Sequence, residues 1–397
     1  MIILLILFKY FNKLNGKKNQ ESPILKLFPW NSNENPIKVN SIRYNQDLSL
    51  LILGTSKGYK IFSSTTFKSV EEENEIICNF GDIHVAELYY SSKIVFLLPS
   101  IYNQKYLSNE IIVFDDYFQK NVGSVKIKSI NIENFYVGQN IISLVTKEKI
   151  IILDIYSLKI INIIEEIAFN DKILSFNSHN ILAYIKASDR KTFYIENFKS
   201  KNSKVESKKT IKITTNFDFI QVMKFSPKGE QIAALSIFGN KLHIYHTSSG
   251  KLKNCIFLGP KIQTLDKIFF SEKKPNYLLF LKNDKTFNIY KIGKAKDKEQ
   301  NQKCICNIDS DQDLVDRLRE LDQKNAGLSK PRSLSKSKAI RDPHVYSDFK
   351  DRPLFADFDR NNHKDLLFID INGKLFKYHF NKKRNGRIEP TLSVQWI

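Results

Sequence analysis

The sequence predicts an all-β fold, a seven-bladed β-propeller of degenerate WD repeats, and three observations support this prediction. From about residue 37 onward, short β-type runs broken by turn residues follow one another, and helix-period stretches are almost absent. The runs form seven groups that start about 43 residues apart, the size of one four-stranded blade. Runs such as 149–155 are apolar almost throughout, as expected of strands buried on both faces. Two packed β-sandwiches are the alternative, but they leave the regular spacing unexplained.

Each group contains three or four expected strands separated by turns. Turn glycines such as Gly54, Gly58 and Gly250 punctuate the strands and need no ligand. The Trp-Asp dipeptide of ordinary WD repeats is missing, so we expect degenerate blades. The seven groups lie at 38–70, 85–129, 131–164, 172–215, 220–257, 265–292 and 353–397.

These groups predict one propeller over 37–397, preceded by a disordered leader at 1–36. The apolar run Ile2–Phe8 is about half the ~20 residues that a membrane span needs. A signal peptide or anchor is the alternative reading of this leader, but the run has no basic start and no small-residue cleavage site nearby. A long loop, expected to be partly disordered, interrupts the sixth blade at 294–350, because no compact propeller needs such a connection.

Charge and composition favour an anionic partner and do not favour catalysis. Lys and Arg number 62 against 42 Asp and Glu, a net charge of +20, which suits either a nucleic acid or an acidic membrane surface. The basic residues are scattered and lack aromatic interleaving, so we do not expect nucleic-acid binding. No nucleophile elbow, triad or carboxylate pair is present, and His243 and His246 lack a third ligand at metal spacing. We therefore expect neither an enzyme nor a cofactor or metal.

The sixth-blade insertion contains an expected helix followed by a basic tract. Ser310–Gly327 has helix punctuation, and the following stretch up to Arg341 has basic residues, serines and no acid. We expect this tract to attract anionic membranes, since each cation near such a surface adds ~1 kcal/mol. A disordered loop of biased composition is the alternative. The tract's basic residues are Lys330, Arg332, Lys336, Lys338 and Arg341.

Several strings resemble the PROPPINs, the autophagy-related WD-repeat β-propellers that bind polyphosphoinositides. Arg43–Phe62, with its Asn-Gln-Asp and Gly-Thr-Ser-Lys-Gly-Tyr-Lys strings, resembles their first blade. Asn109–Ile127 resembles the second blade, Gln231–Leu252 the fifth and Leu366–Phe380 the last. The resemblance therefore extends from about residue 40 to the end of the chain.

The resemblance also implies where lipid headgroups bind. The family motif, an aromatic residue or Leu followed by Arg-Arg-Gly, reads here Ile256, Phe257, Leu258 and Gly259. Guanidinium forks make paired bonds to phosphate, so losing both arginines predicts weakened or absent binding of phosphatidylinositol 3-phosphate and 3,5-bisphosphate. The residues that the resemblance assigns to the headgroup pockets are Ser236, Asn240, His243, Thr286 and Asn288.

The function that follows from the resemblance is that of a scaffold. We expect a cytoplasmic, monomeric protein, peripheral on autophagic or endolysosomal membranes, that recruits autophagy proteins such as a lipid-transfer partner to phosphoinositide-containing membranes. A WD-repeat-like protein-interaction scaffold without lipid binding is the alternative, and the missing arginines favour it.

Overall fold

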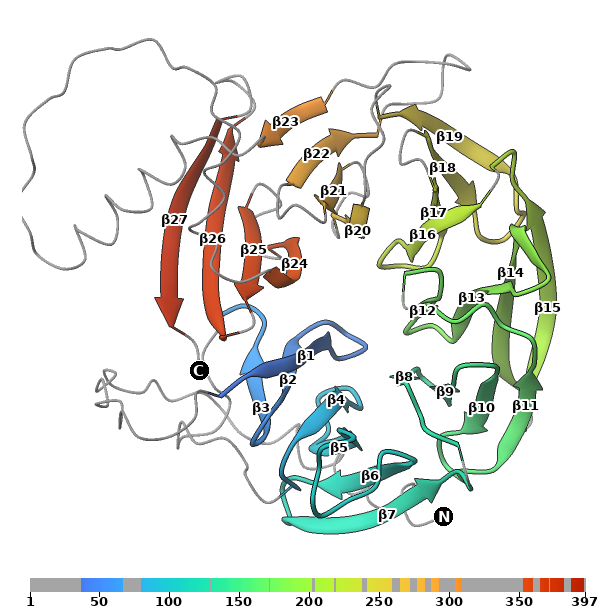
Figure 1. The fold of residues 1–397 in the computed structure, drawn as a ribbon, viewed down its shortest axis with the longest axis vertical. Coiled ribbons are helices and arrows are strands. Elements are labelled where there is room, and N and C mark those ends of the chain that lie inside the picture. The colour runs from blue at the N-terminus through green and yellow to red at the C-terminus, as the bar shows by residue number, and fades with distance from the viewer. Residues whose placement is uncertain are drawn as a thin grey trace, which may run out of the picture. The chain divides into compact units, whose positions relative to one another are not determined.

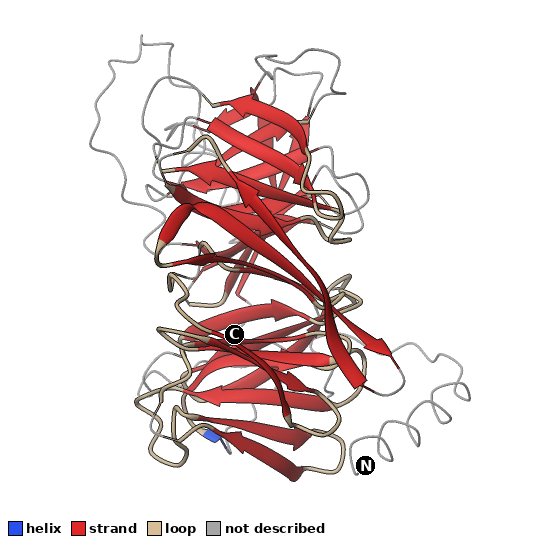
Figure 2. Ribbon diagram, turned by 90° about the vertical axis from the view of Figure 1, so that its right-hand side faces the viewer, coloured by secondary structure: helices blue, strands red, loops and turns tan. Residues whose placement is uncertain are grey.

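The structure is a computed structural model, and apart from a helical residue at Phe80 every regular element in its described part is a β-strand (Figures 1 and 2). It describes residues 37–66, 80–128, 130–170, 172–201, 204–217, 219–237, 241–258, 265–271, 277–282, 287–292, 304–308, 353–359, 365–370, 372–381 and 387–395. The strands form seven antiparallel sheets, each built from strands consecutive in the chain. This arrangement agrees with the seven blades predicted from the sequence. The leader 1–36 lies outside the described residues.

The chain divides into two compact units, and the first contains blades one to three. Blade one is β1 (Val39–Tyr44), β2 (Leu50–Thr55) and β3 (Gly58–Ser63). Blade two is β4 (Ile83–Leu88), β5 (Ile94–Pro99), β6 (Glu110–Asp115) and β7 (Lys120–Lys126). Blade three is β8 (Asn134–Val137), β9 (Ile141–Val145), β10 (Ile150–Asp154) and β11 (Ile160–Ile164). The fourth strand that the sequence predicts for blade one, at 67–70, falls outside the described residues.

The second unit contains blades five to seven and most of blade four. Two stretches of blade four, Ser178–Asn180 and Phe198–Lys208, belong to the first unit. Blade four is β12 (Ser175–Asn177), β13 (Ile181–Lys186), β14 (Asp189–Lys201) and β15 (Lys204–Thr214). Blade five is β16 (Ile220–Phe225), β17 (Gln231–Ser236), β18 (Lys241–His246) and β19 (Leu252–Phe257). Blade six is β20 (Leu265–Phe270), β21 (Tyr277–Lys282), β22 (Phe287–Lys291) and β23 (Cys304–Ile308). Blade seven is β24 (Pro353–Phe358), β25 (Asp365–Asp370), β26 (Lys374–Asn381) and β27 (Arg387–Gln395).

One stretch differs from the sequence-based expectation. The outer strand of blade six, β23, lies inside the stretch 294–350 that we predicted as loop, and it pairs with β22 through Phe287 opposite Ile308. Its five residues are too short a pattern to stand out from the sequence around them. The hairpin of β14 and β15 extends over the lysine-rich stretch within the predicted group 172–215, because backbone pairing does not require apolar side chains.

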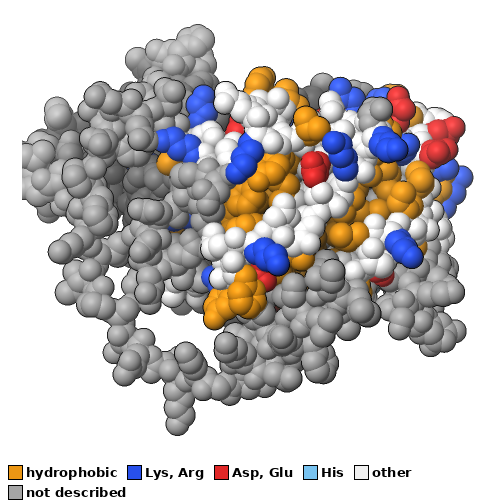
Figure 3. Space-filling model, turned by 90° about the horizontal axis from the view of Figure 1, so that it is seen from below, with side chains coloured by type: hydrophobic (Ala, Val, Ile, Leu, Met, Phe, Trp, Pro, Cys, Tyr) orange, Lys and Arg blue, Asp and Glu red, His pale blue; other side chains and the backbone are white. Residues whose placement is uncertain are grey.

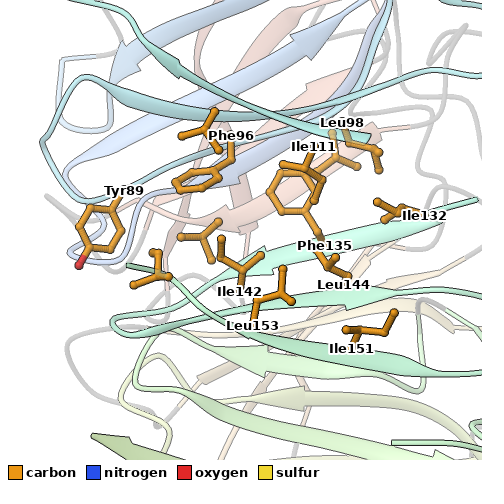
Figure 4. Close-up of a cluster of buried hydrophobic side chains, with 14 of the residues drawn as sticks. Tyr89, Phe96, Leu98, Ile111, Ile132, Phe135, Ile142, Leu144, Ile151 and Leu153 are labelled. Atoms are coloured by element: carbon orange, nitrogen blue, oxygen red, sulfur yellow. The ribbon is translucent and has the colours of Figure 1, made fainter. Parts of the chain in front are cut away.

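The core consists of apolar side chains between successive blades within each unit. Figure 4 shows the cluster between blades two and three, where Phe96, Ile111, Phe135 and Leu144 are at most 1% exposed. Equivalent clusters lie between blades four and five, five and six, and six and seven. Inner strands are buried on both faces, which explains their continuous apolar runs.

A polar residue also ties the first three blades together. The side-chain amide nitrogen of Gln46, in the turn after β1, donates to the carbonyl oxygens of Leu88 and Val137, each at 2.9 Å. Its amide oxygen accepts a hydrogen bond from the backbone N–H of Tyr90. One side chain therefore satisfies three backbone groups from two other blades.

Candidate functional site

His243 lies in β18, the third strand of blade five, and is 8% exposed. Its Nδ1 is 3.0 Å from the hydroxyl of Tyr245, and its ring lies 4.4 Å, centroid to centroid, from that of Phe217. Burial lowers the pKa of His243 to about 4, and the positive charge of Lys241 adds to this shift. At neutral pH the imidazole is therefore uncharged and can donate or accept a hydrogen bond without carrying a positive charge.

A pocket of about 350 Å³ opens at this histidine. Its walls come from the end of β15, the residues that follow it, β18, the turn before β19 and β19 itself. Gly250 (φ +68°) forms that turn, and a Cβ there would lie 3.0 Å from Cγ2 of Ile211, so the close approach requires glycine. The pocket is lined by Lys212, Ile213, Thr214, Asn216, His243, Tyr245, Gly250 and Leu252.

The polar residues on one side of this pocket alternate with buried residues along the chain. Lys212, Thr214 and Asn216 are exposed, whereas Ile213 and Thr215 between them are buried. Lys212 provides a positive charge, and the hydroxyl and amide provide hydrogen-bond donors, which together suit an anionic group such as a phosphate. Sequence reasoning missed these three residues, although their period-2 alternation with isoleucine was a visible signal.

The headgroup residues predicted by resemblance do not form a single site. His243 pairs with Ala234, whose side chain belongs to the cluster between blades four and five. Asn288 pairs with Phe280, whose side chain belongs to the cluster between blades five and six, so Asn288 lies on a different blade interface from His243. Its Oδ1 is buried and has no hydrogen-bond partner among the described residues.

Of the other three predicted headgroup residues, the structure describes only Ser236. Ser236 ends β17 and is 5% exposed, and its Oγ accepts a hydrogen bond from the backbone N–H of Lys241 at 3.4 Å. Asn240 and Thr286 lie outside the described residues. The resemblance implied two separate pockets, and His243 lines the pocket described above.

The degenerate motif position is part of the core. Ile256 is fully buried and Leu258 is 7% exposed, and both belong to the cluster between blades five and six. By the resemblance, Leu258 stands where the family motif has an arginine, and in the structure its side chain packs among apolar side chains. The side chain of Phe257, all of Gly259, the expected helix Ser310–Gly327 and the basic tract from Lys330 to Arg341 lie outside the described residues.

The described residues hold neither a metal-ligand cluster nor a membrane-spanning helix. These residues contain no group of three or more His, Cys, Asp or Glu side chains placed to hold a metal ion. Within the same part of the chain, no helix has the length and apolar character needed to span a bilayer.

Comparison with known proteins identifies the fold. No protein-family model matches the chain. SVP1-like protein 2 of Schizosaccharomyces pombe is 27% identical over 89 residues, which are 22% of this chain and 24% of that relative's length. The structure of Hsv2 from Kluyveromyces lactis matches with a TM-score of 0.65 at 14% identity, over 91% of this chain and 100% of Hsv2. The fold is the seven-bladed β-propeller of the PROPPINs.

A second solved structure shows the same fold. The complex of KlAtg21 with the coiled coil of AgAtg16 matches with a TM-score of 0.58 at 13% identity, over 90% of this chain and 99% of the matched chain. The fold class predicted from the sequence and the resemblance to the PROPPINs are both confirmed. At these identities the solved structures establish the fold, so function is argued from the site.

Proposed function

We propose that this protein is a non-catalytic, autophagy-related propeller scaffold that recruits partner proteins to phosphoinositide-containing membranes. The observation that carries the proposal is the pocket at His243, because a residue assigned to headgroup binding by resemblance lines a hollow that also presents Lys212. In this proposal the protein is cytoplasmic and binds peripherally to autophagic or endolysosomal membranes.

The chemistry of the pocket predicts weak headgroup binding. The ammonium of Lys212 is a single point charge, whereas a guanidinium makes two parallel bonds to a phosphate. His243 is uncharged at neutral pH and contributes a hydrogen bond at most. Each lost charge-assisted pair removes ~1.5–3 kcal/mol of binding free energy, so the protein should bind phosphoinositides more weakly than a propeller with both arginines.

The proposed partners are proteins of the autophagy machinery. The matched structure of KlAtg21 is a complex with the coiled coil of AgAtg16, which supports a segment of this kind as a partner. We extend this partner class, and the lipid-transfer partner implied by the resemblance, to the present chain.

A second function is favoured by a specific observation, the burial of Leu258 in the core. A chain that has replaced a phosphate ligand by an apolar core contact could act as a protein-interaction scaffold without lipid binding. The two functions differ in one measurable property, headgroup-specific attachment to vesicles.

The test is co-sedimentation of the full chain with vesicles that contain phosphatidylinositol 3-phosphate. Control vesicles contain phosphatidylserine in place of phosphatidylinositol 3-phosphate, in the amount that gives the same total negative charge. Both sets of vesicles are measured at two salt concentrations. Lys212→Gln removes the pocket cation, and Lys228→Gln is the matched control, because Lys228 is exposed in a turn of blade five and does not line the pocket.

The proposal predicts headgroup-dependent binding that weakens in Lys212→Gln and is unchanged in Lys228→Gln. Binding that depends only on total negative charge and disappears at higher salt would instead assign attachment to the basic tract from Lys330 to Arg341. No binding to either vesicle would support the protein-interaction scaffold.

A further inference from the structure

The loop between β5 and β6 of blade two, residues 100–109, carries the most exposed large apolar side chains in the described part of the chain. Tyr102 is 79% exposed and Ile101 is 70% exposed, and Leu107 of the same loop is 55% exposed. Single apolar residues on a surface are ordinary, but three in one loop indicate a contact surface. Figure 3, seen from below Figure 1, where β6 and β7 lie, shows hydrophobic side chains gathered on the surface with Lys and Arg between them.

This loop is held in one conformation by the side chain of Asn103. The amide nitrogen of Asn103 donates to the carbonyl oxygens of Phe80 at 2.7 Å and Asp82 at 2.8 Å. Its amide oxygen accepts hydrogen bonds from the backbone N–H groups of Lys105 at 2.8 Å and Tyr106 at 2.9 Å. The ring of Tyr106 also stacks on that of Phe80, with 5.9 Å between the centroids. The exposed apolar side chains therefore extend from an anchored loop.

The most exposed part of the loop is a β-turn that bonds to itself. The backbone N–H of Asn103 donates to the carbonyl oxygen of Ser100 at 3.0 Å, and the N–H of Tyr102 donates to Oγ of Ser100 at 3.1 Å. Ile101 and Tyr102 are the two central residues of this turn. Backbone groups that enter a lipid layer need partners within the protein, because lipid supplies few. The turn presents its apolar side chains while its own atoms satisfy these N–H groups.

The charges around the loop favour an anionic surface. Lys105 belongs to the loop, and Lys128 lies beside it, because the backbone N–H of Ile127 donates to the carbonyl oxygen of Asn109 at 2.9 Å. Both lysines are exposed, whereas every Asp and Glu among residues 80–128 is at least partly buried. The exposed part of this blade therefore combines apolar side chains with positive charge. A bilayer with anionic headgroups complements both properties.

We propose that the loop 100–109 is a membrane-contact site that enters the interfacial layer of an anionic bilayer. Its three exposed apolar side chains take up the boundary between headgroups and acyl chains, and its two lysines lie against the anionic headgroups. Tyr suits this position because its ring is apolar and its hydroxyl can stay hydrated. The contact needs no phosphoinositide and does not involve the pocket at His243, so it goes beyond the proposed function.

The test is co-sedimentation of the full chain with vesicles of phosphatidylcholine and phosphatidylserine that contain no phosphoinositide. The loop variant carries Ile101→Ser and Tyr102→Ser. The matched control carries Ile160→Ser and Tyr117→Ser, which remove the same two residue types at positions 56% and 57% exposed. We expect the affinity of the loop variant for these vesicles to fall about tenfold, and that of the control to equal the natural chain. Urea midpoints equal to that of the natural chain show that both variants are folded.

A second measurement reports insertion directly. Bromine atoms on lipid acyl chains quench the fluorescence of an indole that reaches them, so Tyr102→Trp is compared with Tyr117→Trp. The natural chain, with its 2 Trp, gives the background. We expect stronger quenching in Tyr102→Trp than in the other two proteins.

Three results would overturn the proposal: a natural chain that does not bind these vesicles, equal affinities of the loop variant and its control, or equal quenching at positions 102 and 117. A loop that is covered by a protein partner instead would give the second and third results. Because these vesicles contain no phosphoinositide, the outcome is independent of whether the pocket at His243 binds a headgroup.

Discussion

The side-chain amide nitrogen of Gln46 lies 2.9 Å from the carbonyl oxygen of Val137, 91 residues further along the chain. A residue in the first turn of blade one therefore supports the first strand of blade three. The same side chain also bonds to the backbone of Leu88 and Tyr90 in blade two.

Gln46→Ala should destabilise the protein. The change leaves two carbonyl oxygens and one N–H without their partner, and each unsatisfied group costs ~1–3 kcal/mol when it stays dry. We expect the free energy of unfolding to fall by about 2–4 kcal/mol in urea denaturation, less if water enters the space. Gln104→Ala, at an exposed loop position, is the control and should unfold like the natural chain. Equal midpoints for the two variants would contradict the role assigned to Gln46.

Acid should destabilise the fold through His243. The folded-state pKa of His243, about 4, lies below the ordinary value of 6.5, so the unfolded chain binds more protons between these two pH values. The contribution of uncharged His243 to the free energy of unfolding is full above pH 6.5 and is lost as the pH falls toward 4. We expect His243→Gln to reduce the loss of stability between pH 7 and pH 4 by on the order of 1–2 kcal/mol, after allowance for partial solvent access. Urea midpoints at several pH values measure this, and parallel curves for the two proteins would be evidence against it.

Restoring an arginine at the motif position should not restore a headgroup site. Leu258 is 7% exposed within the cluster between blades five and six, so Leu258→Arg buries a charge among apolar side chains. We expect a loss of about 3 kcal/mol or more in the free energy of unfolding and no gain in vesicle binding. Leu107→Arg is the matched control, because Leu107 is 55% exposed and does not line the pocket. Tighter headgroup binding by a stable Leu258→Arg variant would show that the pocket geometry of the PROPPINs is intact here.

Tyr59→Phe should weaken the contact between blades one and two. The hydroxyl of Tyr59 donates a 2.6 Å hydrogen bond to Oδ1 of Asp116, a buried carboxylate whose Oδ2 lies 3.5 Å from Nζ of Lys93. Hydrogen bonds to charged groups contribute ~1.5–3 kcal/mol, and we expect a loss within this range in thermal or urea unfolding. Tyr102→Phe provides the comparison, because Tyr102 is 79% exposed, and its midpoint should not move. A loss of the same size in both variants would rule out the specific role of the Tyr59 bond.

The sequence predicted the fold well, because the signals for blades are local. Apolar runs of strand length and turn glycines are properties of neighbouring residues, and they placed nearly all the strands. The Asn-Gln-Asp string was noticed as a family feature, but its role was not predictable, since the partners of Gln46 lie 42 and 91 residues away.

The site was predicted less completely. Resemblance assigned His243, which lines the pocket, but the neighbouring blade supplies Lys212 and Thr214. Sequence spacing does not reveal which strands of adjacent blades face each other. The burial of Leu258 likewise depends on packing against blade six, so its substitution for arginine could be noted from sequence but its surroundings could not.

The hydrogen bonds of Gln46 also constrain the order in which the chain can acquire its native contacts. During synthesis, residue 46 emerges long before residue 137, and domains fold from the amino terminus as the chain grows. Until Val137 is available, the turn after β1 lacks one of its backbone acceptors in another blade, and contacts between such distant residues form slowly. Blade one therefore reaches its final set of bonds only when the first strand of blade three is in place, so the amino-terminal blades should mature together, late in the translation of this unit.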